Sequence, residues 1–146
     1  FGANVKRSGD SIFSSASHLV PAKLDAISLG SCLPHAIVLA SLAFGTTEIS
    51  NAIALKGRQS KRLRLLLREL SRMGIKSEER EGKVFISGGK LNGADLQPEG
   101  DSACAMALSV AALAAEGPSR ILGAECVEKS YPGFFLDLAK LGAIIR

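Results

Sequence analysis

A repeat of 72 residues constrains the fold of this chain more than any other feature of its sequence. At this offset glycine, cysteine and apolar residues coincide, and the matching pairs are Gly2 and Gly74, Leu19 and Leu91, Leu24 and Leu96, Cys32 and Cys104, Gly45 and Gly117, and Ile49 and Ile121. With a short gap Gly74 also corresponds to Gly142, because both end similar segments, Leu-Ser-Arg-Met-Gly and Leu-Ala-Lys-Leu-Gly. Such a period predicts a supersecondary unit that occurs more than once.

Within one unit the pattern predicts the order strand, helix, strand, helix, strand, strand. In the first copy we expect a strand near residues 24–28, a helix over about 33–44 and a short strand at 47–50. Gly45 is predicted to end the helix, because glycine adopts the left-handed conformation at low cost. The alternation of strands with helices of about a dozen residues indicates an α/β fold.

The second half of the unit is an amphipathic helix followed by a pair of strands. Leucines on one face predict a helix from Ser60, a candidate N-cap, to Gly74. Strands are expected at 75–78 and 83–87. Phe1-Gly2-Ala3 resembles the end of the same helix, so the chain is expected to hold about two units and the tail of a third.

The second unit begins near Ala94 and shows the same order. A helix is predicted over 103–115, with Asp101 as its N-cap, and a short strand over 120–122. The last helix is expected to start at Ser130, with Pro132 in its first turn, and to stop at Gly142.

Composition narrows the class of protein. The chain has 146 residues, of which 47% are hydrophobic and 22% charged, values typical of an ordered globular domain. No apolar run has the roughly 18 residues that a membrane span needs, so we expect a cytoplasmic protein that does not enter the membrane. The three cysteines lack metal-ligand spacing and are read as structural thiols in a reducing compartment, so neither a metal nor a cofactor is expected.

Basic residues are concentrated between Lys56 and Lys76, where eight lysines and arginines accompany one acid, Glu69. This cluster favours anionic partners. Arg64, Arg68 and Arg72 recur at every fourth position and could form a stripe that contacts nucleic-acid phosphates. No aromatic residue interleaves with the stripe, so a solvated helix face is the preferred interpretation and a nucleic-acid-binding module the less favoured one.

Two segments resemble the C-terminal part of the EPSP synthases (3-phosphoshikimate 1-carboxyvinyltransferases). Residues 101–117, DSACAMALSVAALAAEG, match the family segment D-H-R-x-A-M-A-L-x-V-A-A-L-A-A-E-G without a gap. Residues 129–135, KSYPGFF, match K-[ST]-[FY]-P-x-[FY]-F. The resemblance implies repeated βαβαββ units of an enolpyruvyl-transferase-like inverse α/β barrel. Residues 1–146 would form a single, partial C-terminal domain of a two-domain enzyme of the shikimate pathway, which makes aromatic amino acids.

The resemblance also implies where acid–base residues should lie, and here the chain departs from the family. Ser31 takes the place of the Asp that acts at the shikimate hydroxyl, and by its residue type and place alone it is a candidate helix N-cap. Gln59 replaces the Glu of the family's K-E-S-D-R-L segment, and Ser102 and Ala103 replace the His and Arg of D-H-R. None of these side chains can move a proton as a carboxylate or imidazole does, so we name no catalytic residue.

The positions that bind anions are better preserved. In the same segment Arg62 matches the contact to the phosphoenolpyruvate carboxylate, Arg58 replaces a lysine, and Ser60 is retained. Lys129 matches the family's lysine that binds phosphoenolpyruvate. The resemblance therefore implies Lys129, Arg62, Arg58 and Ser60 as residues for anions such as phosphoenolpyruvate or shikimate 3-phosphate.

Two interpretations of activity stay open. In the first, the domain keeps anion binding and has lost carboxyvinyl transfer, which makes it a pseudoenzyme candidate. In the second, it belongs to a divergent active transferase whose acid–base groups come from a missing N-terminal domain or from Glu48, Glu125 or His35. Two units of a three-unit domain would expose an apolar face, so the missing domain or a homodimer partner is expected to cover it.

Overall fold

The predicted order of the first unit is present between residues 23 and 88 of the computed structural model, which describes all residues from 1 to 146. The elements are β3 (Lys23–Asp25), α2 (Leu33–Leu42), β4 (Gly45–Ser50), α3 (Gly57–Arg72), β5 (Lys76–Arg80) and β6 (Lys83–Gly88). The four strands form one sheet in the order β3-β4-β6-β5. In this sheet β3 and β4 are parallel, and the other two pairs are antiparallel. Short helical turns, α1 (Ala26–Leu29), η1 (Gly30–Cys32) and η2 (Ala52–Ala54), join these elements.

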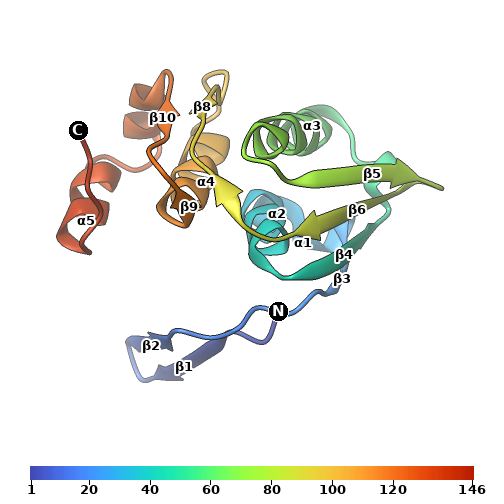
Figure 1. Ribbon diagram of the computed structural model, residues 1–146, viewed down its shortest axis with the longest axis horizontal. Coiled ribbons are helices and arrows are strands. Elements are labelled where there is room, and N and C mark those ends of the chain that lie inside the picture. Colours follow the sequence, from blue (N-terminus) through green and yellow to red (C-terminus); the bar gives the residue numbers. More distant parts are fainter.

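The second unit repeats the order strand, helix, strand, helix of the first unit, with shorter strands. It contains β8 (Asp95–Leu96), α4 (Ser102–Leu113), β10 (Arg120–Ile121), η3 (Ala124–Lys129) and α5 (Phe134–Lys140). A further small parallel pair, β7 (Leu91–Asn92) and β9 (Ala115–Glu116), precedes and follows the α4 region. Figure 1 shows this unit beside the first, with α4 next to α2 and α3.

The strand register confirms the 72-residue repeat. In the first unit Leu24 of β3 lies opposite Ile49 of β4. In the second unit Leu96 of β8 lies opposite Ile121 of β10, and each of these residues is 72 positions further on. The sequence period is therefore a period of the hydrogen-bonded structure.

Individual hydrogen bonds repeat as well. The Ala22 N–H donates to Thr47 Oγ1 at 3.3 Å, and 72 residues later the Ala94 N–H donates to Ser119 Oγ at 3.3 Å. Both hydroxyls lie next to the parallel strands and satisfy a main-chain donor that has no strand partner there. Substitution of Thr by Ser preserves the contact, because only the hydroxyl takes part.

The hairpin formed by β1 (Asn4–Ser8) and β2 (Ser11–Ser15) is the predicted tail of a third unit. At the 72-residue offset these strands correspond to β5 and β6. The hairpin lies apart from the rest of the chain in Figure 1, and every residue in its strands is exposed. Ile12 is 73% exposed, whereas its equivalent Val84 in β6 is completely buried. The difference arises because β6 lies between β4 and β5, while β2 pairs only with β1.

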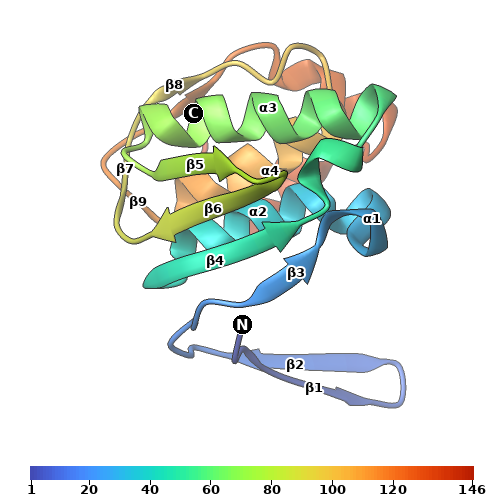
Figure 2. The same cartoon turned by 90° about the vertical axis from the view of Figure 1, so that its right-hand side faces the viewer.

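One hydrophobic core serves both units. Helix α2 packs against α3, α4 and β6, and α3 also packs against α4. Figure 2 shows α3 alongside β5, with α2 and α4 behind the sheet. The buried cluster includes Ile37 of α2, Leu66 of α3, Ile86 of β6 and Leu108 of α4. Because α2 and α4 occupy equivalent positions, the repeat brings two Ala-rich helices into direct contact.

An apolar groove of about 220 Å³ runs between α2 and α4. Val38, Leu39 and Leu42 of α2 line it with Ala107 and Val110 of α4. Leu39 and Val110 are both partly exposed, so this face carries unpartnered apolar surface. No helix of the chain is both long enough and apolar enough to cross a membrane.

Three predicted N-caps are wrong, although the neighbouring helices exist. Ser31 lies inside η1, and Ser60 lies in the first turn of α3, which begins at Gly57 after Lys56. Ser130 follows η3, where its N–H and that of Tyr131 both donate to the Val127 carbonyl. These bonds continue the 3₁₀ turn past residue 129 and delay α5 until Gly133. The predicted stops at Gly74 and Gly142 are confirmed, with φ of 93° and 102°.

Candidate anion-binding site

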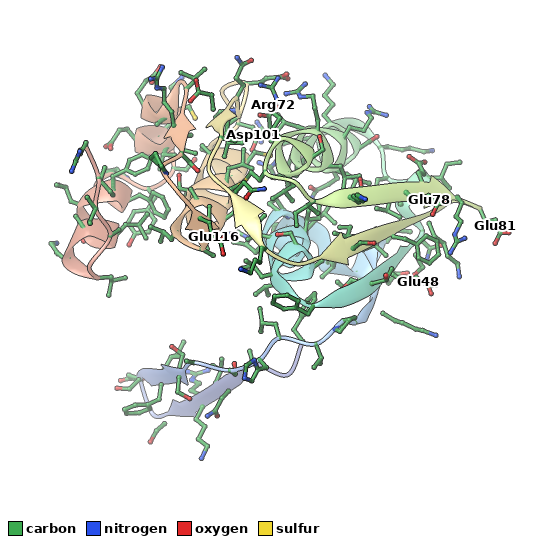
Figure 3. The ribbon with its side chains drawn as sticks, in the orientation of Figure 1. Glu48, Arg72, Glu78, Glu81, Asp101 and Glu116 are labelled. Carbon is green, nitrogen blue, oxygen red and sulfur yellow. The ribbon has the colours of Figure 1, made fainter.

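The predicted site residues of α3 meet the start of α4 through Asp101. Asp101 caps α4, since its Oδ1 accepts the Cys104 N–H at 3.1 Å. The same carboxylate accepts hydrogen bonds from Arg62 Nε at 3.0 and 2.9 Å. Arg58 Nε lies further away, 3.8 Å from Asp101 Oδ2. Figure 3 labels Asp101 at this junction between α3 and α4. The capping role predicted for Asp101 is thus confirmed.

The charge of Asp101 is stabilised where it lies. Burial raises the pKa of this carboxyl, but the hydrogen bonds from Arg62 and from the Cys104 N–H, with the positive charge of Arg58, outweigh burial and lower the pKa overall. The side chains of Arg62 and Asp101 are only 12% and 18% exposed. The pair is therefore ionised at neutral pH and shielded from much of the solvent.

The guanidinium of Arg62 is consequently only partly hydrogen-bonded within the chain. Its Nε is occupied by Asp101, while its two Nη groups make no hydrogen bond within the chain. A guanidinium held in this way is oriented in advance, and its free donors suit a carboxylate or phosphate. Asp101 partly neutralises the charge that such a ligand would meet.

The other residues predicted to bind anions lie around this pair and differ in exposure and hydrogen bonding. Arg58 is 78% exposed at the rim, and Ser60 makes no side-chain hydrogen bond. Lys129 is exposed at the end of η3. The next residue, Ser130, has its Oγ 2.6 Å from Ser102 Oγ in the first turn of α4. The structure thus brings Lys129 to the same end of α4 as Asp101.

Of the three positions expected to carry acid–base groups, Gln59 and Ser102 are engaged in neutral contacts, and Ser31 makes no side-chain hydrogen bond. Gln59 Nε2 donates to the Gly30 carbonyl at 2.6 Å, which ties α3 to the turn that contains Ser31. Gln59 Oε1 is buried and has no hydrogen-bond partner. The third position, Ser102, bonds to Ser130. These side chains can donate or accept hydrogen bonds, but none is a general base near neutral pH.

Two of the residues considered as replacements, Glu48 and His35, do not lie at this junction. Glu48 is on β4, where Lys83 Nζ contacts its Oε1 at 2.7 Å, and Figure 3 shows it on the sheet far from Asp101. His35 lines the apolar groove between α2 and α4. Glu125 is exposed in η3, the element that also carries Lys129.

Glu69 is a buried acid whose role the sequence analysis missed. It is completely buried, and its carboxylate contacts Arg68 Nε at 2.7 Å and Arg72 Nε at 3.5 Å. It also accepts the main-chain N–H of Gln97 at 2.9 Å. Two of the three arginines in the predicted basic stripe therefore neutralise this acid. Glu69 is the one acid among eight basic residues in this part of the sequence, and this isolation could have indicated that it pairs with them.

No group of three or more His, Cys, Asp or Glu side chains in the chain could hold a metal ion. The three cysteines are free, and Cys104 is buried beneath the α4 N-terminus. Burial, followed by the nearby charge of Asp101, raises the pKa of the Cys104 thiol to about 12.

Comparison with known proteins gives the family. The profile of EPSP synthase (3-phosphoshikimate 1-carboxyvinyltransferase) matches residues 1–138. The chain belongs to the EPSP synthase family. It is 45% identical over 123 residues to the 3-phosphoshikimate 1-carboxyvinyltransferase of Methanocella arvoryzae, a match that covers 84% of this chain and 29% of the relative. It is 41% identical over 141 residues to the protein of that name from Thermococcus kodakarensis, covering 97% of this chain and 35% of the relative.

Solved structures of the same class share the fold. The EPSP synthase of Acinetobacter baumannii superposes with a TM-score of 0.78 at 27% identity, over 97% of this chain and 36% of that one. The enolpyruvyl transferase NikO of Streptomyces tendae gives a TM-score of 0.79 at 25% identity, over 99% of this chain and 34% of that one. The inverse α/β barrel units expected from the resemblance are thus confirmed, and the chain spans about a third of the length of these relatives.

Proposed function

We propose that this chain is most of a C-terminal domain that binds the anionic ligands of EPSP synthases but supplies no acid–base group for carboxyvinyl transfer. The observation that carries the proposal is the neutral chemistry at Ser31, Gln59 and Ser102, beside a retained cationic pair, Arg62 and Lys129. In the family phosphoenolpyruvate condenses with shikimate 3-phosphate by addition and elimination, and these steps need groups that move protons.

Binding in this proposal depends on two kinds of cation. Arg62 is oriented by Asp101 and offers its Nη donors, whereas Lys129 is an exposed ammonium without an ion-pair partner near the α4 N-terminus. A carboxylate or phosphate placed between them would also meet the hydroxyls of Ser102 and Ser130. The lack of an arginine at Ala103 removes one charge-assisted contact, which is worth about 2–3 kcal/mol where desolvated.

We further propose that chain outside these 146 residues completes the domain. The exposed hairpin β1–β2 and the apolar groove between α2 and α4 are the two surfaces that an additional unit would cover. The coverage of only about a third of each relative supports an N-terminal domain as the partner, with a homodimer as the alternative. The three unpaired thiols favour a cytoplasmic location.

The test is a phosphate-release assay on the full-length protein with phosphoenolpyruvate and shikimate 3-phosphate, together with calorimetry of each ligand. We expect binding of at least one ligand, no turnover, and weaker binding in Lys129→Ala. Lys76→Ala, which removes an exposed lysine on β5, is the matched control and should bind as the wild type does. Turnover that Lys129→Ala abolishes would overturn the proposal in favour of a divergent active enzyme. If neither ligand binds, only the fold has been inherited.

A nucleic-acid-binding function is the weaker candidate. Arg68 and Arg72 of the stripe contact the buried carboxylate of Glu69, so their charge is compensated within the chain.

A further inference from the structure

The exposed face of α3 forms one wall of an open groove of about 620 Å³. Five basic side chains of α3 line this groove, namely Arg58, Lys61, Arg62, Arg64 and Arg68. Glu99 and Asp101, just before α4, form the opposite wall. Leu65 is the one hydrophobic side chain in the lining, so the groove is polar along its length.

The acidic wall is fixed to α3 at both ends. Arg62 holds Asp101, and Arg68 Nη2 contacts Glu99 Oε1 at 2.8 Å. Glu99 has a φ of 53°, in the left-handed region that non-glycine residues rarely adopt, and its ion pair with Arg68 accompanies this conformation. Because Arg62 and Arg68 have carboxylate partners, both hold the two walls of the groove together, and Arg62 keeps its Nη donors free.

Lys61, directly before Arg62, and Arg64, between Arg62 and Arg68, have no carboxylate partner. Both side chains are exposed. Arg58, three residues before Lys61, is 78% exposed and only loosely associated with Asp101 at 3.8 Å. A spacing of three residues corresponds to a rise of about 4.5 Å, so these three available cations extend over about 9 Å of the helix.

We propose that this groove binds an anion that carries two or more phosphate groups, with Lys61 and Arg64 as the principal contacts. A line of separated cations favours an extended polyanion, because one small anion cannot be close to all of them. The absence of aromatic side chains from the lining removes the stacking platform that a nucleobase would need. The groove shares Arg58, Arg62 and Asp101 with the candidate anion-binding site, but this proposal depends on Lys61 and Arg64, which the proposed function does not require.

The test is calorimetry of the full-length protein with inorganic tripolyphosphate, and with orthophosphate as the single-phosphate comparison. We expect saturable binding of tripolyphosphate that weakens as salt is added. Orthophosphate is expected to bind at least about tenfold more weakly, since it meets fewer cations. The double variant Lys61→Ala/Arg64→Ala should lose about tenfold or more in tripolyphosphate affinity, with an unchanged far-ultraviolet circular dichroism spectrum.

Two controls separate this groove from other sites. Lys76→Ala is expected to bind tripolyphosphate normally, and Lys129→Ala should change its affinity less than twofold. Equal affinity for orthophosphate, an unchanged double variant, or a loss in Lys129→Ala as large as in the double variant would each overturn the proposal. Tighter binding of a short DNA duplex than of tripolyphosphate at the same salt concentration would also overturn it, in favour of a nucleic-acid site.

Discussion

The buried carboxylate of Glu69, near the C-terminal end of α3, accepts the main-chain N–H of Gln97 at 2.9 Å and so joins α3 to the residue that follows β8 in the second unit. This contact links two units that are otherwise held together mainly by apolar packing between their helices. Arg68 and Arg72 compensate the charge, and Arg68 continues to Glu99 in the groove wall. A single acid thus organises both the interface between the units and the turn before α4.

Glu69→Gln is expected to lower the free energy of unfolding by about 2 kcal/mol, because a neutral amide can still accept the Gln97 N–H but no longer compensates two arginines. Urea denaturation followed by circular dichroism measures the change. Glu78→Gln, on exposed strand β5 and labelled in Figure 3, is the matched control and should shift stability by less than about 0.5 kcal/mol. Equal effects of the two variants would show that the Glu69 contacts contribute no net stability.

Asp101→Asn should destabilise the chain by about 1–2 kcal/mol. Asparagine is as good an N-cap as aspartate, so this variant retains the cap of α4 and removes the ion pair with Arg62. Asp101→Ala, which loses both, is expected to cost about 1 kcal/mol more. Urea midpoints of the three proteins at neutral pH separate the two contributions. If the Asn and Ala variants were equally stable, the capping contribution would be absent.

The stability that Asp101 contributes should disappear in acid. Because the folded-state pKa of Asp101 is lowered relative to its ordinary value, the unfolded chain takes up the proton first as the pH falls. The contribution is therefore complete above about pH 5 and is lost as the pH drops through the lower, folded-state pKa. Urea midpoints measured from pH 7 to pH 3 should show the difference between wild type and Asp101→Asn narrowing below pH 4. A constant difference over this range would contradict the assignment.

Two neighbouring glycines, Gly88 at the end of β6 and Gly89 directly after it, should respond very differently to substitution by alanine. A Cβ on Gly88 would lie 2.1 Å from the Ala43 carbonyl oxygen and 2.4 Å from that of Ala40, both main-chain atoms of the α2 region. Gly89 has no atom within 4 Å of the same position and does not have a positive φ. Gly88→Ala is expected to lose about 3 kcal/mol or more, and Gly89→Ala less than about 0.5 kcal/mol. Thermal unfolding of both variants measures this contrast, which similar melting temperatures would refute.

The three cysteines should differ in reactivity. Cys32 is exposed, whereas Cys104 is buried and its thiol has a pKa of about 12, so almost none of it is thiolate at pH 8. Iodoacetamide at pH 8 is expected to modify Cys32 quickly and Cys104 only after urea is added, as followed by mass spectrometry of peptides. Rapid modification of Cys104 in the folded protein would mean that the start of α4 opens readily.

Much of the fold could be predicted from the sequence, because its signals are local or periodic. Gly74 and Gly142 mark helix ends that require left-handed backbone, and the leucines of α3 mark its buried face. The stop predicted at Gly45 is wrong, because α2 ends at Leu42 with Ala43 as its C-cap, and Gly45 begins β4. The same local reasoning failed at Ser60 and Ser130. A serine can cap a helix, but the hydrogen bonds of the preceding turn decide where that helix starts.

The candidate site was only partly predictable for a related reason. The motifs identify Arg62 and Lys129 as residues that bind the same ligand, but they do not show that the Nε of Arg62 donates to Asp101. It also treated Arg68 and Arg72 as free basic groups, although both contact Glu69. Side-chain pairing depends on which elements lie together in space, and the motifs contain no such information.

The sequence by itself determined the 72-residue unit, its order of strands and helices, and the replacement of three acid–base positions by neutral side chains. These properties depend on residue type and on spacing along the chain. Only the tertiary structure decided which charges are free and which are compensated. Arg62 and Asp101 are 39 residues apart, and Glu69 and Gln97 are 28 apart, so they meet only when α3 packs against the start of the second unit. The packing of helices therefore gives Arg62 and Arg68 carboxylate partners, and it leaves the Nη groups of Arg62 together with Lys61, Arg64 and Lys129 available to ligands.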